Sequence, residues 1–114
     1  MNARTVVAKE LSELFKQLSH PDRVRLVEEL RGGERSVNDL AKALSLPGPR
    51  VSQHLSTLKA HRLVEERREG RQHLYRLTQP ALADWVVGAV HFVEGRVPID
   101  PNIVHAALAA WLGI

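Results

Sequence analysis

The chain has 114 residues and a mass of 12.8 kDa, which suffices for one compact domain with a single hydrophobic core. Its 44% hydrophobic and 25% charged residues argue against disorder, and no apolar run reaches the length of a membrane-spanning helix. The absence of cysteine excludes disulfides, thiolate metal sites and cysteine nucleophiles. The first ten residues lack the apolar stretch of a secretory signal, so the sequence predicts a cytoplasmic protein.

The positive charge is concentrated in the middle of the chain. Residues 46–76 hold seven Lys/Arg against three Asp/Glu, whereas residues 77–114 hold one against three. Clustered Lys and Arg attract phosphate, and the pI is near 9.8. The charge pattern therefore favours a polyanionic partner, with a merely solvated basic surface as the alternative.

The first two elements are predicted to be helices, over residues 6–18 and 21–30. Apolar residues recur along both segments at helical spacing. Pro21 ends the first helix, because the residue before a proline is pushed out of the helical region, and it suits the first turn of the second helix.

A helix-turn-helix is predicted over residues 36–60. Ser36 is a typical N-cap for a short helix, and a tight turn around Pro47 separates that helix from a second one. In the second helix Val51, Leu55 and Leu58 recur at helical spacing and are expected to face the core.

A β-hairpin is predicted next, over residues 63–77. Two strand-like segments flank Glu69-Gly70, which occupies the position of a tight turn, and arginines crowd the tip. A helix-turn-helix followed by such a hairpin predicts a mainly α fold, a winged helix-turn-helix with a two-stranded wing.

The helix expected over residues 80–95 is apolar on nearly all sides, and Asp100-Pro101 begin a last helix with an apolar stripe. One side of the first helix must pack on the domain and the other on something else, most simply a second copy. We therefore expect residues 1–114 to form a single domain that dimerises through its N-terminal and C-terminal helices, with residues 80–114 as dimerisation and C-terminal helices. The predicted interface residues are Leu11, Leu14, Trp85, Val86, Ala89, Phe92, Val93 and Trp111.

Three segments in this order resemble the ArsR/SmtB family of bacterial transcriptional repressors. They are residues 18–30 (LSHPDRVRLVEEL), residues 51–59 (VSQHLSTLK) followed by Leu63-Val64, and the wing residues 67–71 (RREGR). The resemblance implies a homodimer that binds an inverted-repeat operator in double-stranded DNA, represses transcription and is released by an inducer. The sequence departs from the family at residues 47–49 (PGP), where relatives commonly begin the recognition helix with a Ser-containing segment.

A recognition helix reads bases through polar side chains on its exposed face, and a basic wing contacts the minor groove or phosphates. Gln53 has the groups for a bidentate pair with adenine, and Arg50 for guanine or a phosphate. The predicted DNA-binding residues are Arg50, Ser52, Gln53, His54, Thr57, Lys59, Arg67, Arg68 and Arg71.

We predict no cofactor and no metal. A metal site known in the family on the helix after the wing would find only its second half here, in His91 and Glu94, because Thr78 and Pro80 fall on the first half. Asp84, His91 and Glu94 are nonetheless the metal candidates, which a partner helix would have to complete. We favour the interpretation that these three side chains are polar residues hydrogen-bonded to one another at an interface. The inducer is left open between a small organic molecule, a protein partner and none.

Two other functions compete with DNA-binding regulation. An enzyme is disfavoured because Ser52 and His54 diverge on their helix and no glycine-rich phosphate loop or paired-carboxylate site is present. The other rival is a winged-helix protein-interaction module without specific DNA binding, against which the arginines around the wing argue.

Overall fold

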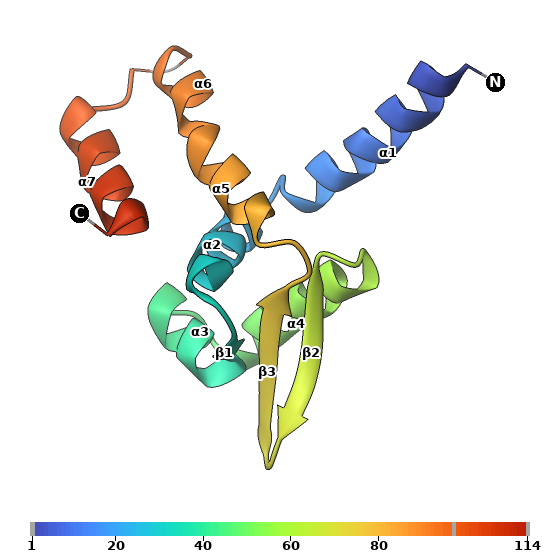
Figure 1. Cartoon of the computed structure of the whole chain (residues 1–114). Helices are drawn as coiled ribbons and strands as arrows, with labels where there is room; N and C mark the ends of the chain where they lie inside the picture. The colour runs from blue at the N-terminus through green and yellow to red at the C-terminus, as the bar shows by residue number, and fades with distance from the viewer. Residues whose placement is uncertain (1, 97, 114) are drawn as a thin grey trace.

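The computed structural model describes residues 2–96 and 98–113 and shows helices gathered at one end of a small sheet, whose hairpin projects away from them (Figure 1). The helices are α1 (Ala3–Gln17), α2 (Pro21–Glu29), the short 3₁₀ helix η1 (Leu30–Gly32), α3 (Val37–Leu44), α4 (Gly48–Ala60), α5 (Ala81–Gly88), α6 (Val90–Glu94) and α7 (Pro101–Leu112). The strands are β1 (Arg35–Ser36), β2 (Val64–Glu69) and β3 (Gln72–Leu77). Within the described ranges, no helix has the length and apolar character needed to cross a membrane.

The helix starts follow from local chemistry. Pro21 occupies the first turn of α2, and the His20 imidazole caps that helix by accepting a hydrogen bond from the Asp22 backbone N–H at 3.2 Å. Ser36 caps α3, as predicted, by accepting a hydrogen bond from the Asp39 backbone N–H at 3.1 Å. Each cap satisfies one of the backbone N–H groups that the first turn of a helix leaves without a partner.

The hairpin belongs to a three-stranded antiparallel sheet in the order β1–β3–β2. The sequence predicted only the two strands of the wing, because β1 is two residues long and carries no alternating pattern. The turn consists of Gly70 and Arg71, one residue later than predicted, and Gly70 has a φ of +61°. That left-handed conformation favours glycine at the first turn position.

The core lies between α2, α3, α4, α5 and the sheet. The three α4 residues predicted to face inward, Val51, Leu55 and Leu58, are 0% exposed, which confirms that prediction. They pack in one cluster with Leu26 and Leu40. Because α4 is anchored along this face, its opposite face is held in place at the surface.

The segment after the wing differs from the single helix predicted over residues 80–95. A one-residue interruption at Ala89 divides it into α5 and α6, directly after Gly88, a residue that stabilises helices poorly. Val86, predicted to lie at a dimer interface, is 8% exposed and is part of the chain's own core. The prediction placed it on the wrong side of α5, because a helix apolar nearly all round gives no indication of which side faces inward.

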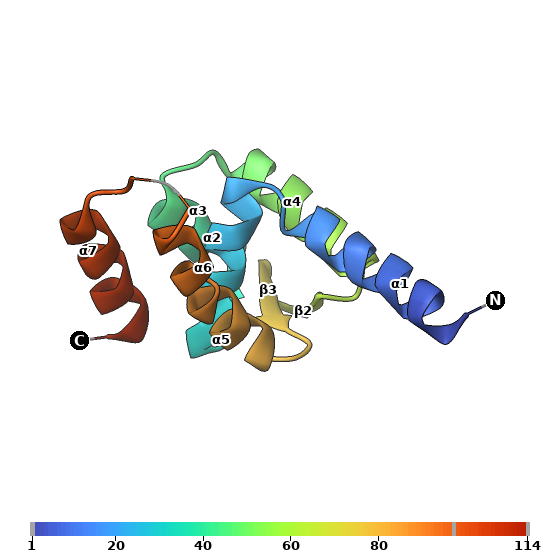
Figure 2. The same cartoon turned by 90° about the horizontal axis from the view of Figure 1, so that it is seen from above.

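The first and last helices extend away from this core. Viewed from above, α1 and α7 lie on opposite sides of the body formed by α2 to α5 (Figure 2). Gln17 is the one buried residue of α1, and α7 has no buried residue. Both helices therefore keep apolar side chains at the surface.

Candidate nucleic-acid interface

The outer face of α4 carries the polar side chains that the sequence singled out. Gln53 is exposed, while Ser52 and Thr57 on either side of it are half-buried. The Thr57 hydroxyl donates a hydrogen bond to the Gln53 backbone carbonyl at 3.2 Å, so its lone pairs alone are left to face outward. Gln53 is thus the most exposed of these three polar side chains.

Arg50 lies on the side of α4 that faces the start of α2. Its Nη2 atom is 2.8 Å from the Asp22 carboxylate oxygen Oδ2, although the Arg50 side chain is 53% exposed. Because the Arg50 side chain is half exposed, its guanidinium can turn towards an external anion, but Asp22 Oδ2 then loses the cation nearest to it.

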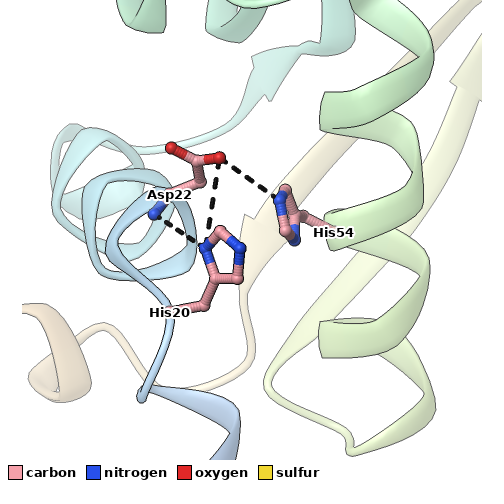
Figure 3. Close-up of side chains that lie close together, drawn as sticks. All are labelled: His20, Asp22 and His54. Carbon is pink, nitrogen blue, oxygen red and sulfur yellow. Dashed lines mark hydrogen bonds and ion pairs between the residues drawn. The ribbon is translucent and has the colours of Figure 1, made fainter.

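His54, by contrast, points into the interface between α4 and α2 (Figure 3). Its side chain is 12% exposed, its Nε2 atom lies 3.4 Å from Asp22 Oδ2, and its Nδ1 atom accepts a hydrogen bond from Arg23 Nε at 3.3 Å. Its ring centroid is 4.4 Å from that of His20. The imidazole predicted to contact DNA is therefore engaged within the chain.

The surroundings of His54 also set its charge. Burial lowers its pKa below the ordinary value, and the neighbouring His20 and Arg23 lower it further, while the Asp22 carboxylate works in the opposite direction. The neutral imidazole is consequently the form that this environment favours.

His20, Asp22 and Arg23 were not among the predicted site residues, yet the fold brings them against α4. Arg23 also donates a hydrogen bond from Nη1 to Gln17 Oε1 at 2.9 Å, and Gln17 is the buried residue at the end of α1. A chain of hydrogen bonds thus runs from α1 through Arg23 to His54. These residues lie in the segment 18–23 (LSHPDR), which carries part of the family resemblance. That resemblance was the one sequence signal that could have marked them as site residues.

The three wing arginines do not share one face of the hairpin. Successive strand residues point to opposite sides, so Arg67 and Arg68 face apart. Arg67 forms ion pairs with Glu34 at 2.7 Å and Glu69 at 3.1 Å, and its guanidinium lowers the pKa of Glu34. Arg68 and Arg71 have no acidic partner within 4.0 Å among the residues that the structure describes. These two are therefore the wing cations with the most freedom to meet a phosphate.

A hollow of about 450 Å³ separates the wing from the starts of α3 and α4. Within it, the Tyr75 hydroxyl donates a hydrogen bond to Glu66 Oε2 at 2.5 Å, which lowers the pKa of Glu66. Burial and this carboxylate raise the pKa of Tyr75 to about 12. Lys59 lies 3.5 Å from Glu66 Oε1, so this predicted DNA contact also has an internal partner. The residues lining the hollow are Ser36, Val37, Asn38, Gly48, Ser52, Glu66, Arg71, Gln72, His73 and Tyr75.

The metal candidates from the sequence do not come together in one chain. Asp84 forms an ion pair with Arg31 at 2.7 Å, while His91 and Glu94 approach only each other, at 3.9 Å. Within the described ranges, the one trio whose ligand atoms all lie within 4.8 Å of one another is His20, Asp22 and His54. The sequence missed this trio because its members are up to 34 positions apart.

The short helix α3, the helix α4 with its exposed polar face and the arginine-bearing β2–β3 hairpin follow one another in the chain. This arrangement defines a winged helix-turn-helix protein. The profile described as "Bacterial regulatory protein, arsR family" matches residues 20–66. The transcriptional regulator KmtR of Mycobacterium tuberculosis is 39% identical over 95 residues, which cover 83% of this chain and 73% of that protein. The chain belongs to the ArsR family of bacterial regulatory proteins.

Two further comparisons agree with this assignment. The transcriptional repressor SmtB of M. tuberculosis is 46% identical over 78 residues, and the match spans 68% of this chain and 58% of SmtB. The homodimeric winged helix-turn-helix DNA-binding domain Mb0332 of Mycobacterium bovis superposes with a TM-score of 0.68 at 27% identity, covering 83% of this chain and 87% of that one. KmtR and SmtB are named as transcriptional regulators and not as enzymes.

Proposed function

We propose that the chain is a DNA-binding transcriptional repressor that acts as a homodimer on an inverted-repeat operator. In this proposal residues 36–60 and 63–77 contact DNA, and residues 80–114 serve assembly together with α1. The observation that carries the proposal is the exposed Gln53 at the centre of the outer face of α4, next to a wing whose Arg68 and Arg71 have no acidic partner in the described part of the chain.

Gln53 is the proposed base-reading residue. A major groove accommodates an α-helix, and a glutamine amide can donate to and accept from the same adenine edge. Since α4 is fixed on the core by Val51, Leu55 and Leu58, the amide is presented from a rigid element. Ser52 and Thr57 flank it and are proposed to contact base edges or the backbone.

The remaining cations are proposed to position the protein on the phosphates. Arg68 and Arg71 serve this role most directly, whereas Arg50, Lys59 and Arg67 must first exchange an internal carboxylate partner. Such contacts carry no sequence information but strengthen binding to every DNA and make it depend on salt. His54 is proposed to act indirectly, by holding α4 against α2.

The exposed apolar side chains of α1 and α5–α6 support a dimer. Leu11, Phe15, Trp85, Phe92 and Val93 are between 41% and 77% exposed. Phe15 and Trp85 stack on each other across α1 and α5, and exposed apolar side chains that gather in this way often mark an interface. The radius of gyration of 15.4 Å also exceeds the ~13 Å expected of a compact chain of this length. A second copy seated on α1 and α5–α6 would cover these residues, in line with the homodimeric description of Mb0332.

Fluorescence anisotropy on the DNA upstream of the chain's own gene, compared with scrambled DNA, tests the function. Gln53→Ala is expected to cost about 1–3 kcal/mol at one operator position and to relax specificity there. Arg68→Ala is expected to weaken binding to all sequences and to lower the salt slope by about one. Arg76→Ala is the matched control, because Arg76 is a wing arginine already paired with Glu65 at 2.8 Å.

Equal losses on specific and scrambled DNA for Gln53→Ala would refute the base-reading role. A wild-type chain without selective binding at about 150 mM salt would refute the repressor function, because a specific regulator keeps a Kd of about 10⁻⁸ M or below for its site. That second result would instead favour a protein-interaction module.

A further inference from the structure

The side chains of His20, Asp22 and His54 converge (Figure 3), and the function proposed above uses only the packing role of His54 among them. His20 and Asp22 stand at the start of α2, and His54 stands in the middle of α4. The cluster therefore forms only when the two helices pack together, and any ligand held by all three would clamp α4 to α2.

We propose that these residues form a binding site for a divalent transition metal ion of the zinc class. Two imidazoles and one carboxylate are a donor set that zinc and its neighbours bind well, with a fourth position left for water. Two ligand atoms on one tetrahedral ion lie ~3.4 Å apart when each bond is ~2.1 Å. His54 Nε2 is 3.4 Å and His20 Nδ1 is 4.0 Å from Asp22 Oδ2, and the three ligand atoms all lie within 4.8 Å of one another, so side-chain shifts of about 1 Å are needed to close the site.

A second observation at the same place also points to a cation. Asp22 Oδ2 is buried and has no hydrogen bond of acceptable geometry among the described residues. A buried acceptor without a hydrogen bond destabilises the folded chain, and more so when it is charged. The Arg50 guanidinium at 2.8 Å offsets part of this cost through charge alone. A metal ion bonded to Oδ2 would remove the deficit directly.

Binding of the ion requires three existing contacts to yield. His20 Nδ1 would give up the 3.2 Å capping hydrogen bond that it accepts from the Asp22 backbone N–H. A neutral His54 bound through Nε2 carries its proton on Nδ1, so the 3.3 Å bond from Arg23 Nε would break while Arg23 keeps its bond to Gln17. Arg50 would leave Asp22 for solvent, which its 53% exposure permits. Each of these contacts is either a long hydrogen bond or an ion pair of an exposed side chain. The ion would replace them with three metal–ligand bonds, to His20, Asp22 and His54.

One consequence concerns DNA, and it rests on the function proposed above. Metal on Asp22 frees the Arg50 guanidinium from its internal carboxylate, and Arg50 is a proposed phosphate or guanine contact. The ion would also clamp α4 to the body of the domain. Occupancy is therefore expected to tighten operator binding.

Titration of the full-length, metal-stripped chain tests the site without DNA. Calorimetry with Zn²⁺ and the visible absorption of bound Co²⁺ are expected to show one ion per chain in a tetrahedral setting. Asp22→Asn, His54→Gln and His20→Asn are each expected to weaken binding by about tenfold or more, since even residues behind the ligands contribute that much. His20→Asn keeps a good N-cap on α2, so its effect is not one of lost folding. His91→Gln is the matched control, and circular dichroism verifies the fold of each variant.

The site is refuted if the wild-type chain binds no ion at micromolar concentration. It is equally refuted if His91→Gln abolishes binding while His20→Asn and His54→Gln leave it intact, because the ion would then lie on α6. Operator binding is measured separately with and without Zn²⁺. If the chain binds both Zn²⁺ and the operator, and Zn²⁺ leaves the operator affinity unchanged, the link to Arg50 is overturned.

Discussion

Phe92 offers the cleanest test of the proposed dimer. This α6 side chain is 77% exposed, so Phe92→Ser removes little from the folded monomer. Trp85 would be a poorer choice, because its ring stacks on Phe15 at 5.7 Å within the chain and its loss would disturb both states. The effect of Phe92→Ser should therefore fall almost entirely on association.

The size of the effect follows from the exposed area. An aromatic side chain presents ~150–250 Å², so about 150 Å² of Phe92 is open to a partner. Covering that area contributes at most about 4 kcal/mol at ~25 cal/mol per Å². A two-fold dimer buries one Phe92 from each copy, so the upper limit doubles. If half of that limit is realised in binding, Phe92 contributes about 4 kcal/mol per dimer. At about 1.4 kcal/mol per factor of ten, the dimer Kd is expected to rise 100-fold to 1000-fold, to order of magnitude.

Sedimentation equilibrium over a range of micromolar concentrations measures this Kd for the wild type and for Phe92→Ser. Arg76→Ser is the control, because Arg76 is an exposed residue of the wing. The reasoning fails if Phe92→Ser associates as tightly as the wild type, or if the wild type itself sediments as a monomer throughout.

Three further changes probe the fold and its connections. Leu55→Ala, at a side chain with 0% exposure, should cost about 3 kcal/mol in urea unfolding, and a loss below about 1 kcal/mol would contradict its place in the core. Tyr75→Phe should cost about 1–2 kcal/mol at neutral pH by removing the bond to Glu66. Because that bond lowers the pKa of Glu66 from 4.5, the difference between the two proteins should be full above about pH 5 and shrink as the pH falls through the folded pKa; a difference constant from pH 7 to pH 3 would argue against it. Arg31→Ala removes the ion pair to α5 and the 2.7 Å bond to the Trp111 carbonyl, so α7 should become the first segment cut by protease, with the midpoint of global unfolding nearly unchanged. Unchanged cleavage of α7 would show that other contacts hold it.

Much of the fold could be predicted because it depends on neighbours in the sequence. The spacing of Val51, Leu55 and Leu58 identifies the inner face of α4, and Ser36 identifies a helix start, since both features involve residues within two turns of each other. Strand alternation would also have separated Arg67 from Arg68, because adjacent strand residues point to opposite faces. Local periodicity thus sufficed for the helix-turn-helix, the hairpin and the outward position of Gln53, but not for the two-residue β1 or the division between α5 and α6.

The partners of the charged and polar side chains could not be predicted in the same way. His54 follows Gln53 directly and carries an equally polar group, yet it is 12% exposed because α2 packs against that side of α4. Val86 shows the same limit for apolar residues, since a helix apolar on all sides does not indicate which side reaches the core.

The sequence by itself determined the order of the helix-turn-helix and the wing, the core face of α4 and the basic character of the wing, because these follow from periodicity and composition over short stretches. Only the tertiary structure decided that Asp22 meets both Arg50 and His54, and that Arg67 is held by Glu34 while Arg68 is not. The physical reason is that such contacts join residues about 30 positions apart, and the packing of whole helices and strands sets their distances.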